Sequence, residues 1–243
     1  MTTSYDLVVI GAGPAGYPAA IRAAQLGLHT AVVEREHVGG TCLNFGCIPV
    51  RALQRAAHIA HDMRAAANLG FDTRRVAFDI SQLAEYRNQV SATLSQGVEA
   101  VLEQNGVELL VGSARLMGQT GRTPSRHAIR VENREGVKDL SSPYVLLATG
   151  NRPGTLPDIR TDGETIWTIR DALTPKRLPG KLLIVGNQGI MFASIYSDLG
   201  SEVTLVVSTQ TALPYMDDEL IQTLQDILRE RGVTIHTQAK LTD

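Results

Sequence analysis

The sequence predicts an α/β protein made of two tandem units in which strands and helices alternate. A short apolar run at residues 5–10 ends in a glycine and precedes a helical pattern at residues 14–27. A similar order of strand, helix and strand begins at Lys181. The length agrees, because 243 residues are enough for two globular units with cores of their own. We therefore expect two tandem Rossmann-like dinucleotide-binding units, the second of them incomplete.

Turn residues and periodicity place the other elements and the domain boundaries. We expect further strands at residues 29–34, 107–116, 127–132, 144–148, 182–185, 203–207 and 233–236, and helices at 51–67, 81–104, 189–199 and 217–230. Two prolines and two glycines at residues 151–163 indicate a boundary. The predicted organisation is a first domain at 1–150, a linker at 151–180 and a partial nucleotide-binding-like domain at 181–243.

Composition and charge exclude several classes of protein. Hydrophobic residues make up 43% of the chain and charged residues 20%, as in folded soluble proteins. A net charge of -2 provides no basic surface for nucleic acid. The first 20 residues hold no cationic segment followed by a long apolar run, so we expect no signal peptide, no membrane span and a cytoplasmic location.

The first glycine cluster, Gly11-Ala12-Gly13-Pro14-Ala15-Gly16, matches a dinucleotide-binding turn. In such a turn Gly11 permits the tight bend, Gly13 lets a pyrophosphate approach the backbone, and Gly16 lets the helix lie close to the strand. The phosphates would lie at a helix N-terminus, which favours negative charge. Glu34, at the end of the next predicted strand, would accept the ribose hydroxyls. The motif alone does not distinguish FAD from NAD.

The two cysteines, Cys42 and Cys47, lie five positions apart. In a regular helix this spacing separates the residues by about 7.5 Å along the axis, beyond the usual disulfide range, so pairing requires an irregular helix. Gly46 permits such an irregularity, and Pro49 suits the first turn of a following helix. Cys47 would then lie beside a helix N-terminus, which favours the thiolate. Two lone thiols do not complete a zinc site, so we expect no metal; two buried packing cysteines remain the alternative.

Three segments together carry a family resemblance: GAGPAGYPAAIRAAQLG at residues 11–27, VGGTCLNFGCIP at 38–49 and LLATG at 146–150. The chain resembles the pyridine nucleotide-disulfide oxidoreductases, and among them the dihydrolipoamide dehydrogenases most. The resemblance implies an FAD-binding first domain with a redox-active cysteine pair. Cys47 would be the thiolate that faces the flavin, and Cys42 the thiol that exchanges with a dithiol or lipoyl-type substrate. Electrons would pass from the dithiol to the disulfide, then to FAD and NAD.

The resemblance also implies a set of site residues. The catalytic pair is Cys42 and Cys47. The expected cofactor-binding residues are Gly11, Gly13, Pro14, Ala15, Gly16, Glu34, Gly40, Thr41, Arg51, Ala148, Thr149 and Gly150. We expect alkylating reagents to reach Cys42 first, because that thiol would face the substrate.

Several positions depart from the family pattern. Arg51 stands where the family has lysine, and Met191 where it has a glutamate that pairs with that lysine. The second glycine turn, at residues 186–189, is two residues short, and the following strand ends in Val207-Ser208 instead of an acid. These changes weaken the case for NAD binding. Family members are about twice as long, so a complementary chain or a homodimer is an expected partner. The alternatives are a non-catalytic FAD- or nucleotide-binding paralogue or subunit, and another flavin disulfide reductase.

Overall fold

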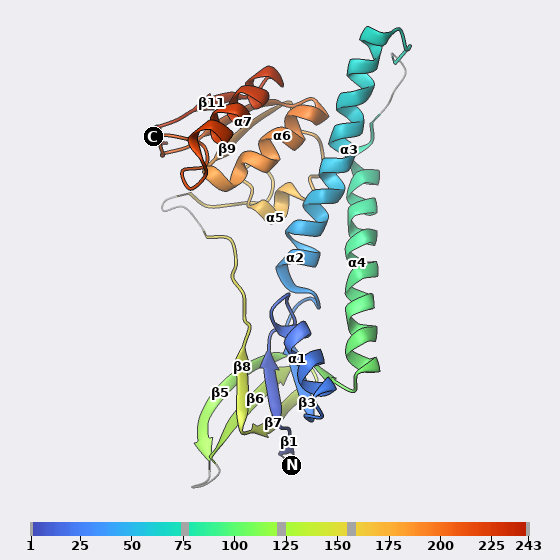
Figure 1. Cartoon of the computed structure of the whole chain (residues 1–243), viewed down its shortest axis with the longest axis vertical. Helices are drawn as coiled ribbons and strands as arrows, with labels where there is room; N and C mark the ends of the chain where they lie inside the picture. Colours follow the sequence, from blue (N-terminus) through green and yellow to red (C-terminus); the bar gives the residue numbers. More distant parts are fainter. Residues whose placement is uncertain (1, 74–77, 121–124, 155–158, 242–243) are drawn as a thin grey trace. The chain divides into compact units, whose positions relative to one another are not determined.

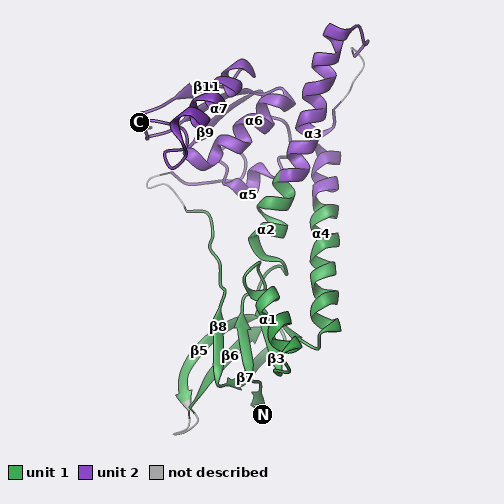
Figure 2. Ribbon diagram, in the orientation of Figure 1, with its two compact units in different colours: residues 1–50, 88–154 green, residues 51–87, 155–243 purple. Residues whose placement is uncertain are grey.

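The computed structural model describes residues 2–73, 78–120, 125–154 and 159–241 (Figure 1). The chain divides into two compact units, Met1–Val50 with Asn88–Gly154, and Arg51–Arg87 with Thr155–Asp243 (Figure 2). The division runs through two long helices, α3 (Cys47–Ala66) and α4 (Ile80–Gln104). Contacts therefore group residues 51–87 with the second unit, whereas the sequence analysis placed them in the first domain.

The first unit is built on a parallel sheet with the strand order β4-β3-β2-β8. Its strands are β2 (Leu7–Ile10), β3 (Thr30–Glu34), β4 (Glu108–Val111) and β8 (Tyr144–Leu147). Strand β2 pairs with β3 on one side and with β8 on the other, so its carboxyl end lies between theirs. In such sheets ligands bind at the carboxyl ends of the strands.

A second sheet covers one face of the parallel sheet, with the order β1-β7-β6-β5. It contains β1 (Thr3–Ser4), β5 (Ser113–Thr120), β6 (Arg126–Asn133) and β7 (Gly136–Ser142). The two sheets meet in one hydrophobic core that includes Tyr5, Val8, Ile129 and Leu140. Burial of these apolar side chains is what holds the two layers together.

Helices cover the other face of the parallel sheet. Helix α1 (Gly16–Gln25) buries Gly16, Ala20 and Ala23, whose spacing puts them on one side. These small residues let the helix lie close to the strands. Leu102 of α4, which is fully buried, belongs to the same core.

Two strand predictions in the first unit were wrong. The strand predicted at residues 107–116 is two strands, β4 and β5, which belong to different sheets. Gly112 lies between them, and a side chain there would come within 2.8 Å of the Glu132 carbonyl oxygen. Strand β7 was not predicted, because only Leu140 and Ser142 of its residues are buried and its pattern is largely polar.

The second unit repeats the strand–helix–strand order. Its parallel sheet has the order β11-β10-β9, formed by β9 (Lys181–Val185), β10 (Glu202–Val206) and β11 (Thr234–His236). Helices α6 (Ile190–Leu199) and α7 (Asp218–Glu230) connect these strands. Asp217 caps α7 by accepting the amides of Glu219 and Leu220. The predicted fold of two Rossmann-like units is confirmed, with helix and strand ends within a few residues of expectation.

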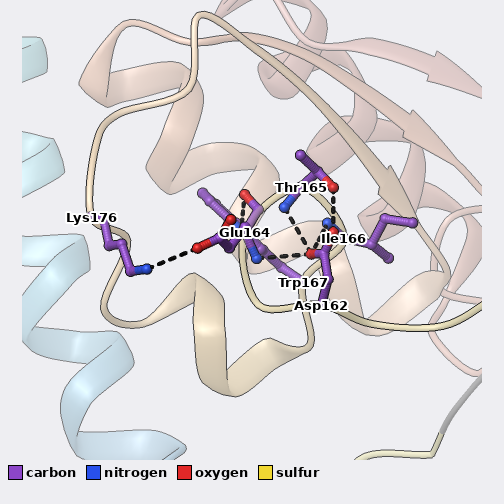
Figure 3. Close-up of polar contacts among 6 residues, drawn as sticks. All are labelled: Asp162, Glu164, Thr165, Ile166, Trp167 and Lys176. Atoms are coloured by element: carbon purple, nitrogen blue, oxygen red, sulfur yellow. Dashed lines mark hydrogen bonds and ion pairs between the residues drawn. The ribbon is translucent and has the colours of Figure 1, made fainter.

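Part of the segment predicted as a linker, residues 151–180, is folded; residues 155–158 lie outside the described residues. The carboxylate of Asp162 accepts the amides of Glu164, Thr165 and Ile166 and the Thr165 hydroxyl (Figure 3). The indole of Trp167 donates to the Glu164 carbonyl, and Lys176 pairs with the Glu164 side chain. A short helix, α5 (Ile169–Ala172), follows, with a capping box at Thr168. Its Ala172 carbonyl accepts the Tyr196 hydroxyl of α6, which joins the segment to the second unit.

A buried carboxylate connects three elements of the second unit. The side chain of Asp198 is 2% exposed and lies in α6. Arg231 donates to it at 2.8 Å, and the Nδ1 atom of His61 in α3 lies 3.2 Å from its other oxygen. Arg64 of α3 donates to the Asp198 backbone carbonyl at 2.5 Å. Within the second unit, the bonds from His61 and Arg64 join the part of α3 that follows Val50 to α6.

Candidate functional site

The glycine turn after β2 approaches the backbone that follows β8. Gly11 has a φ of 106°, and its amide donates to the Val33 carbonyl at 2.8 Å. A Cβ atom on Gly11 would lie 2.2 Å from the Ala148 carbonyl oxygen. Ala148 in turn donates its amide to Ile10. Both the conformation and the contact therefore require glycine at position 11.

Three further glycines pack around the same turn. A Cβ atom on Gly16 would lie 1.8 Å from the Gly11 carbonyl oxygen, and one on Gly40 would lie 2.7 Å from the Cα atom of Gly13. Gly13 is different, because a Cβ atom on it would have as its nearest neighbour the Gly40 Cα atom, at an ordinary contact distance of 3.7 Å. The protein thus leaves room for a side chain at position 13. A glycine there is explained by a ligand that approaches the backbone, which fits a pyrophosphate at this turn.

Glu34 lies at the end of β3 beside the glycine turn. One oxygen of its carboxylate accepts the Ala12 amide at 2.8 Å, and the other accepts the Glu36 amide at 2.8 Å. These bonds orient the carboxylate across the end of β2. Each oxygen of an ionised carboxylate has a second lone pair, so the group can still accept hydroxyl hydrogens.

An ion pair beside this turn was missed by the sequence analysis. Arg152 donates to the Glu36 carboxylate at 2.9 Å, and the two side chains are about half exposed. Glu36 follows β3 and Arg152 follows β8. No local sequence pattern predicts this ion pair, because the two residues are 116 positions apart in the chain.

The cysteines lie on either side of a break between two helices. Helix α2 (Gly40–Asn44) ends just before Phe45, and α3 begins at Cys47. The irregularity predicted around Gly46 is therefore present, and Pro49 lies in the first turn of α3. The Asn44 amide group donates to the carbonyls of Val38 and Gly40, which fixes the end of α2. Asn44 is a second residue that the sequence analysis missed.

The two thiols are in contact and are not joined in a disulfide. Burial raises the pKa of Cys42 above its ordinary value, and a hydrogen bond to the Cys47 sulfur raises it further. Cys47 is the exposed member of the pair and Cys42 is partly buried, which reverses the expectation that reagents reach Cys42 first.

The other expected site residues take simpler positions. Pro14 and Ala15 are exposed just before α1, and Thr149 and Gly150 are exposed after β8. Thr41 is exposed in α2, and Arg51 is exposed one turn beyond Cys47 in α3. Within the described residues, no group of three His, Cys, Asp or Glu side chains lies close enough to hold a metal ion, and no helix is long and apolar enough to cross a membrane.

The positions that depart from the family pattern lie in the second unit. Met191 is 53% exposed in the first turn of α6. The short glycine turn contains a 3-10 helix at Asn187–Gly189. Ser208 is exposed, whereas Val207, the first residue after β10, is 1% exposed.

Known proteins are similar to this chain over nearly its whole length. A dihydrolipoyl dehydrogenase of Zymomonas mobilis is 40% identical over 99% of this chain and 51% of its own length. One from Rhizobium etli is 39% identical over 100% of this chain and 53% of its own length. The chain thus spans about half the length of the curated relatives it matches.

Solved structures show the same fold. The crystal structure of LpdA from Mycobacterium tuberculosis superposes with a TM-score of 0.87 at 30% identity, over 98% of this chain and 52% of that one. The HOCl-induced flavoprotein disulfide reductase RclA from Escherichia coli gives a TM-score of 0.77 at 26% identity, over 98% of this chain and 50% of that one.

A family model gives the assignment directly. The model described as pyridine nucleotide-disulphide oxidoreductase matches residues 5–243, nearly the entire chain. That range includes the glycine turn, the cysteine pair and the whole of the second unit's described sheet. The chain therefore belongs to the pyridine nucleotide-disulphide oxidoreductase family.

Proposed function

We propose that the chain forms the flavin-binding and dithiol-oxidising part of a dihydrolipoyl dehydrogenase-like oxidoreductase. The observation that carries the proposal is the contact between Cys42 and Cys47 in the same unit as the glycine turn. FAD is the cofactor of this family, and the substrate is a dithiol of the lipoyl type. A complementary chain or a second copy would be the partner.

The first unit offers residues for each part of the cofactor. Gly11, Gly13 and Gly16, with Pro14 and Ala15, would bind the pyrophosphate at the start of α1, and Glu34 would accept the ribose hydroxyls. The remaining contacts would come from the segments around Gly40 and Ala148, which meet the turn: Gly40, Thr41, Arg51, Ala148, Thr149 and Gly150. When bound, FAD supplies the acceptor for two electrons.

The cysteines perform the sulfur chemistry by disulfide exchange. In the oxidised pair, a substrate thiolate attacks Cys42, the bond between Cys42 and Cys47 breaks, and Cys47 leaves as a thiolate. The second substrate thiolate then attacks the substrate sulfur of the mixed disulfide and releases Cys42. Cys42 takes up one proton and a second is released to solvent. The substrate has become a disulfide, and its two electrons reside in the Cys42–Cys47 pair.

The protonation of the reduced pair follows from its geometry. Burial and the hydrogen bond to Cys47 raise the pKa of Cys42, which favours the thiol form at this position. Negative charge on the Cys47 sulfur is favoured by its position in the first turn of α3. The exposed position of Arg51, one turn further along, adds positive charge near the same helix end.

Substitution of Gly13 by alanine tests the cofactor site separately from the fold. The new Cβ atom meets only an ordinary contact, so Gly13→Ala should fold and melt like the wild type while losing most FAD affinity. Gly97→Ala is the control, because a Cβ atom at this exposed position in α4 would meet no neighbour, and Gly97 does not have the left-handed conformation that requires glycine. Retained FAD affinity in Gly13→Ala, measured by flavin fluorescence and gel filtration, would falsify the cofactor assignment.

A non-catalytic flavin-binding subunit is the second candidate. This candidate is favoured by Met191, which is exposed where the family has a glutamate. A methionine cannot form the ion pair that the family's glutamate would form with the charge at position 51. The two candidates differ in the thiols. The enzyme forms a Cys42–Cys47 disulfide under mild oxidation that a small dithiol reduces, and the subunit does not, as mass spectrometry of alkylated protein would show.

A further inference from the structure

The glycine turns of the two units are built alike. Gly186 has a φ of 99° and donates its amide to the Val206 carbonyl at 2.9 Å, as Gly11, with a φ of 106°, does to Val33 at 2.8 Å. Gly189 lies so close to β9 that a Cβ atom there would be 2.1 Å from the Ile184 Cγ2 atom. Gly186 and Gly189 thus occupy the places of the first and third glycines of a dinucleotide turn.

The second turn nevertheless differs from the first in length and in charge. Gly16 follows Gly11 by five positions, but Gly189 follows Gly186 by only three, and the second glycine, the counterpart of Gly13, is missing. The acid is missing too. Since Val206 matches Val33 by its bond to the glycine amide, the place of Glu34 is taken by Val207, which is 1% exposed.

The side chain of Asn187 connects the glycine turn to the segment that follows β10. Its amide nitrogen donates to the Thr209 hydroxyl oxygen at 2.8 Å and to the Ala212 carbonyl at 2.8 Å. Asn187 belongs to the glycine turn, where a pyrophosphate would lie, and residues 209–212 follow β10, where a ribose would lie. Both amide hydrogens of Asn187 are used in this connection.

The segment after β10 is also held from its other side. Beyond β11, the Gln238 amide donates to the Thr209 carbonyl at 2.9 Å, and the Ala239 amide donates to the Val207 carbonyl at 3.1 Å. The Thr209 hydroxyl, besides accepting from Asn187, donates to the Thr211 carbonyl at 2.7 Å. Residues 207–212 are therefore fixed on both flanks, and opening a dinucleotide path requires the Asn187 bonds to break.

We propose that Asn187 is a specificity-determining residue that latches the 209–212 segment across the second glycine turn and excludes pyridine nucleotides from this unit. While Asn187 bonds to Thr209 and Ala212, NAD does not fit the residues present. The second unit then serves as a closed domain that binds no pyridine nucleotide. This inference concerns the second unit alone and stands apart from the function proposed for the first.

Energy transfer from the protein to NADH tests the latch. Trp167 is the sole tryptophan of the chain and belongs to the second unit, so its emission reports NADH bound there. The wild type should show no saturable transfer up to about 1 mM NADH, the upper end of ordinary substrate affinities. Asn187→Ala, which frees both acceptors, should show saturable transfer with an affinity at least about tenfold tighter than the wild-type limit, a difference of about 1.4 kcal/mol.

Two further variants control for folding and for general effects on the turn. Gln188→Ala shortens the exposed neighbouring side chain and should behave like the wild type. Thr209→Val removes the hydroxyl that accepts from Asn187 and leaves the bond to the Ala212 carbonyl. This variant should bind NADH measurably but more weakly than Asn187→Ala. It tests the proposal if Asn187→Ala does not fold. Saturable binding by the wild type at micromolar NADH would overturn the proposal. So would variants at both 187 and 209 that fold and still exclude NADH.

Discussion

Arg152 donates to the carboxylate of Glu36 at 2.9 Å, and this ion pair joins the segments that follow β8 and β3. Strand β2 lies between those two strands in the sheet. The pair therefore crosses the carboxyl end of β2, where Gly11 begins the glycine turn. Glu36 also donates its amide to Glu34, so the ion pair is connected to the proposed ribose-binding carboxylate.

Arg152→Gln should weaken FAD binding slightly. The pair is about half exposed, and exposed ion pairs contribute at most about 1 kcal/mol, so the affinity should fall by no more than about fivefold. Added salt should erase the difference, because about 0.5 M NaCl screens exposed charges. FAD titrations at low and high salt measure both effects. Arg130→Gln provides a matched control, because Arg130 forms a similarly exposed ion pair with Asp139 in the same unit. A loss of affinity that persists in salt would contradict an electrostatic role for Arg152.

The two cysteines should differ in reactivity in the reduced protein. Cys47 is exposed, whereas Cys42 is partly buried and has a raised pKa, so a smaller fraction of Cys42 is thiolate at neutral pH. Iodoacetamide should therefore modify Cys47 first, and the rate at Cys42 should continue to rise with pH above the ordinary thiol value. Peptide mass spectrometry over a time course at several pH values measures the two rates. The Cys47→Ser variant isolates Cys42; faster labelling of Cys42 than of Cys47 at neutral pH would contradict the structure.

Asp162 should make the stability of the second unit depend on pH in the acid range. Its bonds to three amides and a hydroxyl hold the pKa of its carboxyl far below the ordinary value (Figure 3). A group whose pKa is lower in the folded state stabilises the fold above its unfolded pKa of about 3.9. That stabilisation is lost as the pH falls from about 4 toward the folded pKa. Urea unfolding followed by Trp167 fluorescence at pH 7, 4 and 3 measures it.

The Asp162→Ala variant should be less stable than the wild type at pH 7, and the difference should shrink between pH 4 and pH 3. The reason is that protonation of Asp162 weakens in the wild type the hydrogen bonds to the carboxylate that the alanine variant already lacks. Asp218→Ala, at an exposed position in the first turn of α7, is the matched control. A difference between Asp162→Ala and the wild type that is the same at every pH would exclude the carboxylate as its source.

Loss of Arg231 should destabilise the second unit strongly. The Asp198 side chain is 2% exposed, and removing a partner of a buried charge costs about 3 kcal/mol. Arg231→Met should therefore lower the free energy of unfolding by roughly that amount, measured with urea and Trp167 emission. Arg229→Met is the comparison, since Arg229 forms an exposed pair with Asp226, three residues earlier in the chain, and its loss should change stability by less than about 1 kcal/mol. Equal effects of the two substitutions would show that burial of Asp198 does not matter.

The sequence by itself determined the features that depend on neighbours along the chain. Gly11 and Gly16 were identified because a tight strand-to-helix turn requires glycine within six residues, whatever the rest of the protein does. The break between Cys42 and Cys47 followed from Gly46 and from the geometry of a helix. The buried parallel strands β2 and β10 were recognisable from short apolar runs bounded by turn residues.

Only the tertiary structure decided which residues from distant segments meet. Strand β7 was missed because its polar pattern becomes a strand only by pairing with β6 and β1. The Glu36–Arg152 pair depends on β3 and β8 flanking β2, and the Asn187 bonds depend on residues 209–212 returning to the second glycine turn. Hydrogen bonds and ion pairs form between groups brought within about 3 Å, and that proximity is set by sheet order and packing, which no local pattern specifies.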